Sequence, residues 1–295
     1  MKTRNLMWQW GINIILMLTA CVCILPFVLL LTSSITDEQA IYQHGYSFFP
    51  EKISFAAYEY LLNDASGILH AYGITIFITV VGTACGLVLT ALLAYPLSRP
   101  NLPFRNLWSF FVFFTMLFNG GLVPTYLVYT QLLDMKNTIW ALIVPGLLMN
   151  AFYVMLMRTF FVTSIPEPVI ESAKIDGAGE LGTFIRIVLP LSLPILATVG
   201  LFQSINYWND WFNGMIYVTD SSLFSLQNLL NRILLDIQFL ASSNFGSSQA
   251  DVSSNAPMET VRMAMAVIGV IPIVVAYPFF QRFFVKGLTV GAVKG

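Results

Sequence analysis

Six runs of apolar residues without Asp, Glu, Lys or Arg constrain this chain more than any other feature. A helix needs about 20 apolar residues to cross roughly 30 Å of hydrocarbon, and each run approaches or exceeds that length. Hydrophobic residues make up 57% of the chain and charged residues 10%, which excludes an ordinary soluble domain. The sequence therefore predicts an all-α integral membrane protein with six transmembrane helices. The expected spans are 13–32, 71–97, 107–132, 138–157, 187–208 and 263–281.

The first apolar run allows two interpretations. It follows Lys2 and Arg4, as in a cleaved signal peptide, and small residues at 32–34 could accept a cut. However, its apolar part is longer than the roughly 7 to 15 residues of a signal core. We therefore expect it to remain as the first transmembrane helix.

The distribution of Lys and Arg predicts the orientation, because cytoplasmic segments carry an excess of these residues. With both termini in the cytoplasm, the inner segments are 1–12, 98–106, 158–186 and 282–295, and the outer segments are 33–70, 133–137 and 209–262. The inner segments then hold ten bases, namely Lys2, Arg4, Arg99, Arg105, Arg158, Lys174, Arg186, Arg282, Lys286 and Lys294. The outer segments hold four, namely Lys52, Lys136, Arg232 and Arg262. This difference favours cytoplasmic termini in a cell membrane.

Several site classes find no support in the residues. Cys21, Cys23 and Cys85 lie in apolar runs without acids or His at ligand spacing, so we interpret them as packing residues and expect no metal site. No basic patch suited to nucleic acid is present. The chain has no GxxxxGK[ST] sequence, so it carries no phosphate-binding loop of its own.

One polar segment, residues 165–191, interrupts the apolar sequence. It gathers four acids and two bases, namely Glu167, Glu171, Asp176, Glu180, Lys174 and Arg186. Ser164 is a plausible N-cap and Pro166 and Pro168 suit a first helical turn, while Gly177 can end a helix at positive φ. We predict a short helix, a glycine corner and a second helix, a rigid elbow suited to docking another protein. A solvated loop with ordinary caps is the alternative that the residues alone leave open.

The same segment resembles a known motif. Glu171-Ser172-Ala173-x-x-Asp176-Gly177-Ala178, followed by Phe184, Ile187, Leu189 and Pro190, closely resembles the EAA motif of permease subunits in binding-protein-dependent ABC importers. Serine stands in place of the first alanine, a small residue for a small one. In that family the motif forms a cytoplasmic coupling helix seated in a groove of the ATPase. The resemblance implies a type I ABC importer permease fold, with a single permease domain over 71–281. It also implies ATPase-coupling roles for Glu171, Ser172, Ala173, Asp176, Gly177, Ala178 and Gly179.

Two further stretches resemble sugar permeases. The end of the chain, residues 287–295, is similar to the tail of maltose-type permeases, which reaches into the ATPase dimer interface. The resemblance implies ATPase contacts by Gly287, Leu288, Thr289, Gly291, Lys294 and Gly295. Residues 118–126 (FNGGLVPTY) and 208–212 (WNDWF) look like the branch that imports complex oligosaccharides, mostly in Gram-positive bacteria.

The family resemblance also implies partners. They are a homologous second permease forming a heterodimer, two cytoplasmic ABC ATPase subunits, and an extracellular sugar-binding lipoprotein. ATP and Mg²⁺ would be bound by the ATPases, so this chain is expected to need no cofactor and to be no enzyme. Its function would be to translocate a sugar or oligosaccharide across the membrane.

A sugar path needs hydrogen-bonding groups and aromatic faces inside a helix bundle. The candidates are Asn119, Asn150, Tyr153, Gln203, Asn206, Tyr207 and Asn209. The alternative for each is structural, since Asn and Gln often join helices and aromatic residues gather at membrane interfaces.

Two other functions are less favoured by the residues than import driven by ATP. An ion-coupled secondary transporter normally needs a carboxylate or His inside the membrane. The six apolar cores contain none, and His70 lies at the outer edge of the second span. An integral membrane enzyme is less favoured still, because neither His44 nor His70 has an acid at useful spacing.

Overall fold

The computed structural model describes residues 2–63, 65–242 and 258–292, with the backbone alone at 2–7, 237, 240–242, 258 and 279–292. Within these residues the chain is helical and forms no strand, apart from one isolated antiparallel bridge between Thr36 and Ile53. The prediction of an all-α protein is therefore confirmed. Two compact units are present. Unit 1 comprises Met1–Ile68 and Leu230–Pro272, and unit 2 comprises Leu69–Leu229 and Ile273–Gly295.

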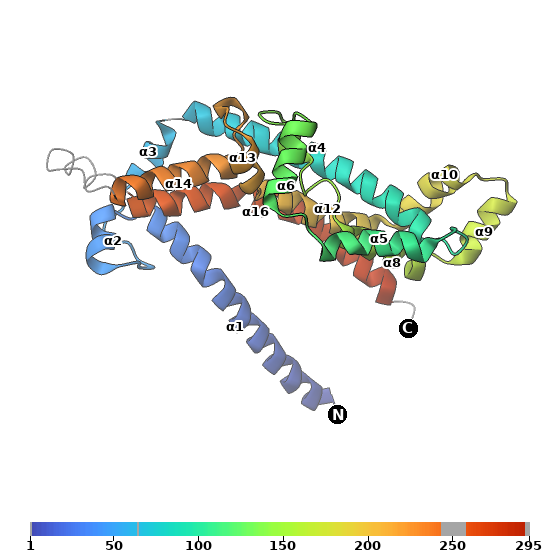
Figure 1. Cartoon of the computed structure of the whole chain (residues 1–295). Helices are drawn as coiled ribbons and strands as arrows, with labels where there is room; N and C mark the ends of the chain where they lie inside the picture. Colours follow the sequence, from blue (N-terminus) through green and yellow to red (C-terminus); the bar gives the residue numbers. More distant parts are fainter. Residues whose placement is uncertain (1, 64, 243–257, 293–295) are drawn as a thin grey trace. The chain divides into compact units, whose positions relative to one another are not determined.

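Figure 1 labels most of the elements in chain order. They are α1 (Lys2–Ser34), α2 (Glu38–His44), α3 (Ala56–Leu62), α4 (Ala65–Ser98), α5 (Arg105–Leu117), α6 (Leu122–Leu127), the π-helix η1 (Val128–Leu132), α7 (Trp140–Ile143), α8 (Ala151–Ser164), α9 (Glu167–Ile175), α10 (Glu180–Thr183), the π-helix η2 (Phe184–Val188), α11 (Leu189–Leu191), α12 (Leu193–Trp208), α13 (Phe212–Tyr217), the 3-10 helix η3 (Ser221–Leu223), α14 (Leu226–Ser242) and α16 (Met258–Ala292).

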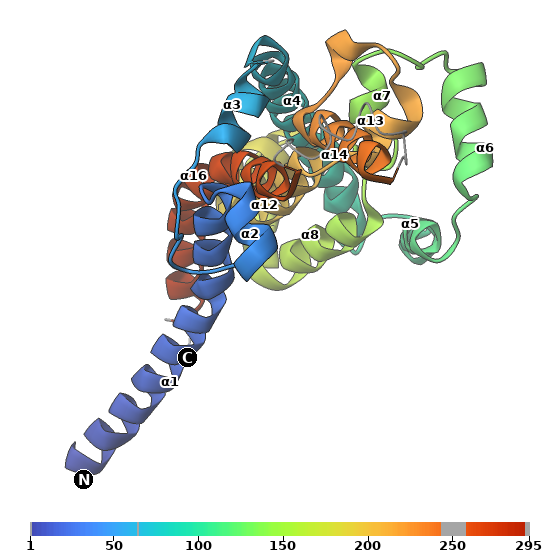
Figure 2. The ribbon, with the colours of Figure 1, turned by 90° about the vertical axis from the view of Figure 1, so that its left-hand side faces the viewer.

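Every predicted span contains an apolar helix, but not every span is one straight helix. In the described part of the chain, three helices are long and apolar enough to cross a membrane: Trp8–Ser34 of α1, all of α4, and Glu259–Pro278 of α16. Two further spans qualify only as bent pairs. The axis turns by 109° between α5 and α6–η1 and by 80° between α10–α11 and α12. Figure 2 shows α6 running in a different direction from α5. The apolar helix α8 is shorter. The count of six spans thus stays a prediction.

The fourth predicted span, 138–157, differs most from the helices observed. Helix α7 ends at Ile143, and Pro145 and Gly146, the latter at φ +71°, interrupt the helical backbone. Helix α8 begins only at Ala151, where the Asn150 carboxamide caps it by accepting the Phe152 N–H at 2.9 Å. It then continues beyond 157 to Ser164. Helix-breaking and capping residues inside an apolar run therefore set the helix ends, which hydropathy alone does not show.

The break between α7 and α8 leaves backbone carbonyls without helical partners, and side chains of unit 2 satisfy them. The Tyr207 hydroxyl donates to the Ile143 carbonyl at 2.9 Å, and the Asn213 amide donates to that of Pro145 at 2.9 Å. The Gln203 amide donates to the carbonyls of Leu147 and Leu148 at 3.3 and 3.4 Å. Unpaired carbonyls are costly in an apolar surrounding, so these side chains make the break tolerable.

Glycines of α4 make room for two of these side chains. Gly82 and Gly86 lie one turn apart on α4, and Gln203 and Tyr207 lie one turn apart on α12. A Cβ at Gly82 would overlap the Tyr207 ring, and one at Gly86 would overlap the Gln203 amide. Small residues spaced by four let helices approach closely in this way. C-terminal to these glycines, residues 91–97 of α4 form an apolar core with α5, α8, α12 and the segment 165–188.

In unit 1, the Glu38 carboxylate of α2 caps the N-terminus of α16. It accepts the backbone N–H groups of Glu259 at 2.8 Å and Thr260 at 2.9 Å, and the Thr260 hydroxyl at 2.7 Å. The positive end of the helix dipole favours a carboxylate there. Glu259 in turn accepts the Tyr46 hydroxyl and pairs with Arg262. The predicted external segment 33–70 is thereby fastened to the last apolar helix.

Gly82→Ala should destabilise the protein, because the new methyl group displaces the fully buried Tyr207 ring and leaves the Ile143 carbonyl unpaired. We expect a loss of about 2–4 kcal/mol, from strain and an unmade buried hydrogen bond together. Thermal denaturation of the purified transporter in detergent measures it. Gly73→Ala, on the same helix with open space around it, is the matched control. Equal denaturation midpoints for the two variants would contradict the assigned crossing.

Glu38→Ala should weaken the start of α16, since three donors lose one acceptor group. The expected loss is about 1–2 kcal/mol, that of a charged helix cap. Hydrogen exchange at the Glu259 and Thr260 amides gives the local readout. Glu59 is an exposed acid on α3, and the control variant Glu59→Ala should leave these amides protected from exchange. Unchanged protection of the two amides in Glu38→Ala would disprove the cap.

Candidate functional site

The polar segment 165–191 folds as the sequence predicts, into two short helices joined at a glycine. Ile165, which precedes Pro166, is held extended and ends α8, so Pro166 is the N-cap of α9 and the predicted cap Ser164 is instead the last residue of α8. At the other end, Gly177 takes φ +81°. We call α9, the turn 176–179 and α10 the elbow.

The corner of the elbow is fixed by backbone hydrogen bonds. The Gly177 N–H donates to the Lys174 carbonyl at 3.0 Å, and the Ala178 N–H donates to the Ala173 carbonyl at 2.9 Å. These two bonds constitute a Schellman motif, which satisfies the last carbonyls of a helix and needs a left-handed residue between them. The predicted glycine corner is confirmed, and its geometry is specified by Gly177.

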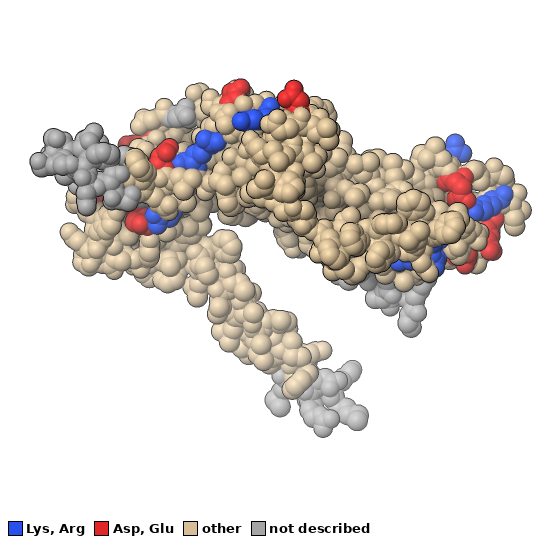
Figure 3. Space-filling view, viewed as in Figure 1, with Lys and Arg blue, Asp and Glu red and all other residues tan. Residues whose placement is uncertain are grey.

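The two faces of the elbow differ in character. Ile170 and Ala173 are buried against the rest of unit 2, whereas Glu171 and Ser172 face outward. Ile175 is 86% exposed, although it is a large aliphatic residue. Figure 3 shows charged side chains gathered at this end of unit 2. An outward face that mixes acids, small residues and exposed apolar side chains is typical of a protein contact surface.

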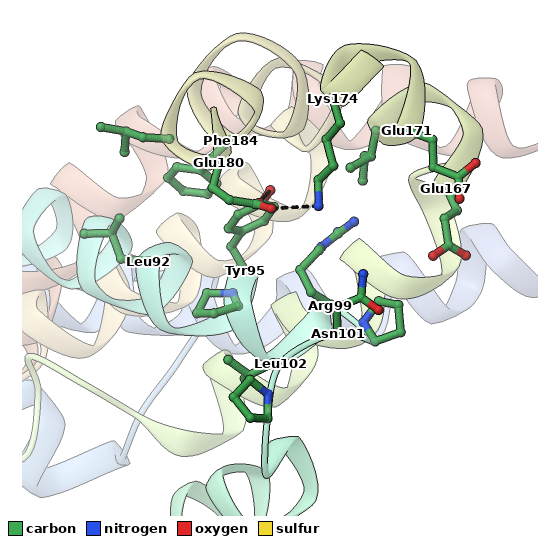
Figure 4. Close-up of a pocket in the computed structure, with 15 residues that line it drawn as sticks. Leu92, Tyr95, Arg99, Asn101, Leu102, Glu167, Glu171, Lys174, Glu180 and Phe184 are labelled. Atoms are coloured by element: carbon green, nitrogen blue, oxygen red, sulfur yellow. Dashed lines mark hydrogen bonds and ion pairs between the residues drawn. The ribbon is translucent and has the colours of Figure 1, made fainter. Parts of the chain in front are cut away.

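A polar network attaches the elbow to the end of α4, as Figure 4 shows. Glu180 of α10 accepts the Tyr95 hydroxyl at 2.8 Å with one carboxylate oxygen and pairs with Lys174 of α9 at 2.7 Å through the other. The hydrogen bond from Lys174, followed by that from Tyr95, lowers the pKa of the Glu180 carboxyl. The carboxylate is therefore ionised at neutral pH. One side chain thus joins three helices.

Aromatic and cationic contacts surround this network. The Tyr95 and Phe184 rings lie 4.9 Å apart between centroids, and the Arg99 guanidinium lies 4.9 Å from the Tyr95 centroid. Beside them is a cavity of about 540 Å³ between the end of α4, the turn 99–103 and the elbow. Its wall combines apolar side chains such as Leu102 and Phe184 with the charged ones of the network.

The predicted coupling residues lie together on the elbow. Glu171, Ser172 and Ala173 are on α9, and Asp176, Gly177, Ala178 and Gly179 form its turn. The contacts predicted for the tail residues stay a prediction. Gly287, Leu288, Thr289 and Gly291 lie in α16 where only the backbone is described, and Lys294 and Gly295 lie outside the described residues.

The predicted substrate-path residues separate into two groups. Gln203 and Tyr207 are buried and bind the carbonyls of the α7–α8 break, as described above. Asn150 caps α8, Asn119 accepts the Gly121 N–H at 2.9 Å, and Asn209 donates to the Ile205 carbonyl at 3.0 Å. These contacts agree with the alternative interpretation, in which the polar side chains have structural roles and do not bind substrate.

Asn206 and Tyr153 make a pair of a different kind. The Asn206 amide donates to the Tyr153 hydroxyl at 2.8 Å, and Asn206 is exposed. The Tyr153 ring is stacked on Phe202, with centroids 6.4 Å apart. Within the part of the chain that the structure describes, no group of three or more His, Cys, Asp or Glu could hold a metal ion.

Comparison with known proteins identifies the family of this chain. Residues 10–290 match the family described as "Binding-protein-dependent transport system inner membrane component". The chain belongs to this family. The resemblance read from the elbow is thereby confirmed, and this inner membrane component is a transport protein of a family that is not enzymatic.

Relatives of this inner membrane component match over nearly the whole chain. Protein LplC of Bacillus subtilis is 39% identical over 276 residues, covering 93% of this chain and 90% of LplC. The polygalacturonan/rhamnogalacturonan transport system permease protein YtcP of Bacillus subtilis is 37% identical over 294 residues, covering 99% of this chain and 100% of YtcP. A crystal structure of a bacterial ABC transporter involved in the import of the acidic polysaccharide alginate contains a chain with 31% identity and a TM-score of 0.76, covering 93% of this chain and 96% of that one. The permease fold is confirmed by this match.

Sequence reasoning missed the roles of Tyr95, Lys174 and Glu180. Tyr95 was assigned to the apolar second span, and the two charged residues were counted only as part of a polar segment. The signals available were the Tyr95-Pro96 pair at the end of an apolar run and opposite charges on either side of Gly177. Neither signal reveals that the chain turns to bring the three side chains together.

Gly177→Ala should loosen the elbow, because an alanine at φ +81° costs about 1–2 kcal/mol. The amide of Ala178 should then exchange its hydrogen roughly tenfold faster, as the Schellman bond opens more often. Gly179→Ala is the matched control, since Gly179 has equally open space but an ordinary φ of −70°. Similar exchange in the two variants would show that the left-handed corner does not hold the elbow.

Proposed function

We propose that this permease translocates a carbohydrate through the membrane, driven by ATP hydrolysis in partner ATPase subunits that dock on the elbow. The observation that carries the proposal is the elbow itself. It combines a Schellman corner at the glycine of an EAA-type motif with an outward face of acids, small residues and exposed Ile175. Its inner face is buried in unit 2, so a push on it is passed to the helices.

The names of the relatives support a carbohydrate as the cargo. YtcP is named for polygalacturonan and rhamnogalacturonan, and the alginate importer handles an acidic polysaccharide. We infer a sugar polymer or oligosaccharide as substrate, delivered by an extracellular binding protein. Asn206 and Tyr153 are the candidates best placed to contact it, because the exposed Asn206 amide meets the hydroxyl of the buried Tyr153 beside an aromatic ring. Gln203, Tyr207, Asn119, Asn150 and Asn209 act mainly through the backbone contacts described above.

The orientation follows from docking. An ATPase reaches the elbow only from the cytoplasm, which agrees with the ten bases on that side and gives cytoplasmic termini in a plasma membrane. The complete transporter would contain this chain, a homologous second permease and two ATPases that hold ATP and Mg²⁺. The tail residues 287–295 would extend toward the ATPase dimer.

Gly177→Pro tests the docking role. Proline cannot adopt positive φ and lacks the N–H that binds the Lys174 carbonyl, so the corner of the elbow must change. We expect the complex to assemble in the membrane while sugar uptake per ATP hydrolysed falls by an order of magnitude or more. Uptake of labelled oligosaccharide into proteoliposomes, measured together with phosphate release, gives both quantities.

Gly73→Ala, at a glycine of α4 outside the elbow with open space around it, serves as the control, with normal uptake expected. The oligosaccharide is chosen beforehand by its stabilisation of the cognate binding protein. Normal uptake in the Gly177→Pro variant would refute the coupling role of the elbow. Uptake by the wild-type transporter without ATP would refute the import mechanism itself.

A further inference from the structure

Three helices carry the elbow, but only two are joined to it through the nearby chain. Helix α8 leads into α9, and α10 continues through η2 and α11 into α12. Helix α4 precedes the elbow by many residues and touches it only through side chains. Any movement of the elbow reaches α4, with its 34 residues, through that non-covalent contact.

The contact has an apolar part and a polar part. Ile170 and Phe184 pack with Tyr95 and Leu97 in one core. Apolar contacts are not directional, so they permit small sliding movements between helices. Hydrogen bonds depend steeply on angle and distance. The Glu180 carboxylate, bound at 2.8 Å by Tyr95 and at 2.7 Å by Lys174, is thus the part of the contact that fixes the orientation of α9 and α10 relative to α4.

We propose that Tyr95, Glu180 and Lys174 form a joint that transmits movement of the elbow to α4 during transport. This proposal rests on the proposed function. We assign the three as positioning residues, because their contacts hold α9 and α10 in place relative to α4. Tyr95 and Glu180 lie outside the stretch 171–179 that carries the docking motif. Lys174 lies within it, but its side chain points back toward Glu180 (Figure 4).

Exposure of the joint explains how it can matter for coupling and little for stability. In the isolated chain the Glu180 side chain is 59% exposed and that of Lys174 42% exposed, and exposed ion pairs contribute little to folding. A partner seated on the elbow would exclude water from the pair and strengthen it. The joint would therefore tighten when the ATPase presses on α9.

Two substitutions and one exchange test the joint. Tyr95→Phe removes one oxygen and keeps the ring on Phe184, and Glu180→Gln removes the ion pair. Both should raise the ATP hydrolysed per sugar imported by roughly threefold, as for the loss of one partly exposed polar pair. The charge exchange Lys174→Glu with Glu180→Lys should return this ratio toward the wild-type value, since the Tyr95 hydroxyl can also accept a hydrogen bond.

The ratio is measured in proteoliposomes with the complete transporter and its binding protein. Partial misfolding lowers uptake and hydrolysis together and leaves the ratio unchanged, so a merely structural role would not move it. Tyr126→Phe is the matched control, because it also removes one hydroxyl from a stacked ring, here one that packs on Tyr217 of α13.

Three outcomes decide the matter. Raised ratios in both variants with recovery in the exchanged pair support the joint. Wild-type ratios in Tyr95→Phe and Glu180→Gln, or an exchanged pair that couples no better than Glu180→Gln, overturn it while the proposed function stands. A wild-type transporter that takes up no sugar with ATP overturns the proposed function and this proposal with it.

Discussion

The backbone must satisfy its own hydrogen bonds in a hydrocarbon environment, and unit 2 is built around one place where it cannot. Between α7 and α8 the helix stops, and the carbonyls of Ile143, Pro145, Leu147 and Leu148 accept hydrogen bonds from side chains instead of from the next helical turn. Tyr207, Gln203 and Asn213 supply the donors. Gly82 and Gly86 then have to be glycine, because only a bare helix surface lets the first two donors lie beneath α4.

This dependence separates what the sequence predicts from what it does not. Hydropathy located the apolar segments, and local rules located the corner at Gly177, because both depend on neighbouring residues. The broken fourth span depends on donors more than 50 residues away. Likewise, Gln203 and Tyr207 were candidates for binding sugar because they are polar residues in an apolar span. In the structure they instead donate hydrogen bonds to backbone carbonyls of the α7–α8 break. This role is visible only when the spatial proximity of α12 to the break is known.

The elbow shows the opposite case, in which local sequence determined much of the geometry. Pro166 ends one helix and starts another through its effect on Ile165, and Gly177 ends α9 without any distant contact. What local rules could not supply is the attachment to α4. Tyr95 and Glu180 are 85 positions apart, and their hydrogen bond exists only because the intervening helices fold back on α4.

Helix α4 therefore contacts both the elbow and the α12 side chains that bind the carbonyls of the α7–α8 break. Toward its C-terminus it receives the Tyr95 contact from the elbow, and three turns earlier its glycines hold the α12 side chains that close the α7–α8 break. The Asn206–Tyr153 pair connects α12 with α8 at the level of that break. A displacement of α4 at Tyr95 must move Gly82 and Gly86 against Tyr207 and Gln203, because the packing there leaves no space for sliding. In the proposed mechanism, the Tyr95 contact and the Asn206–Tyr153 pair are thus connected through α4 and α12.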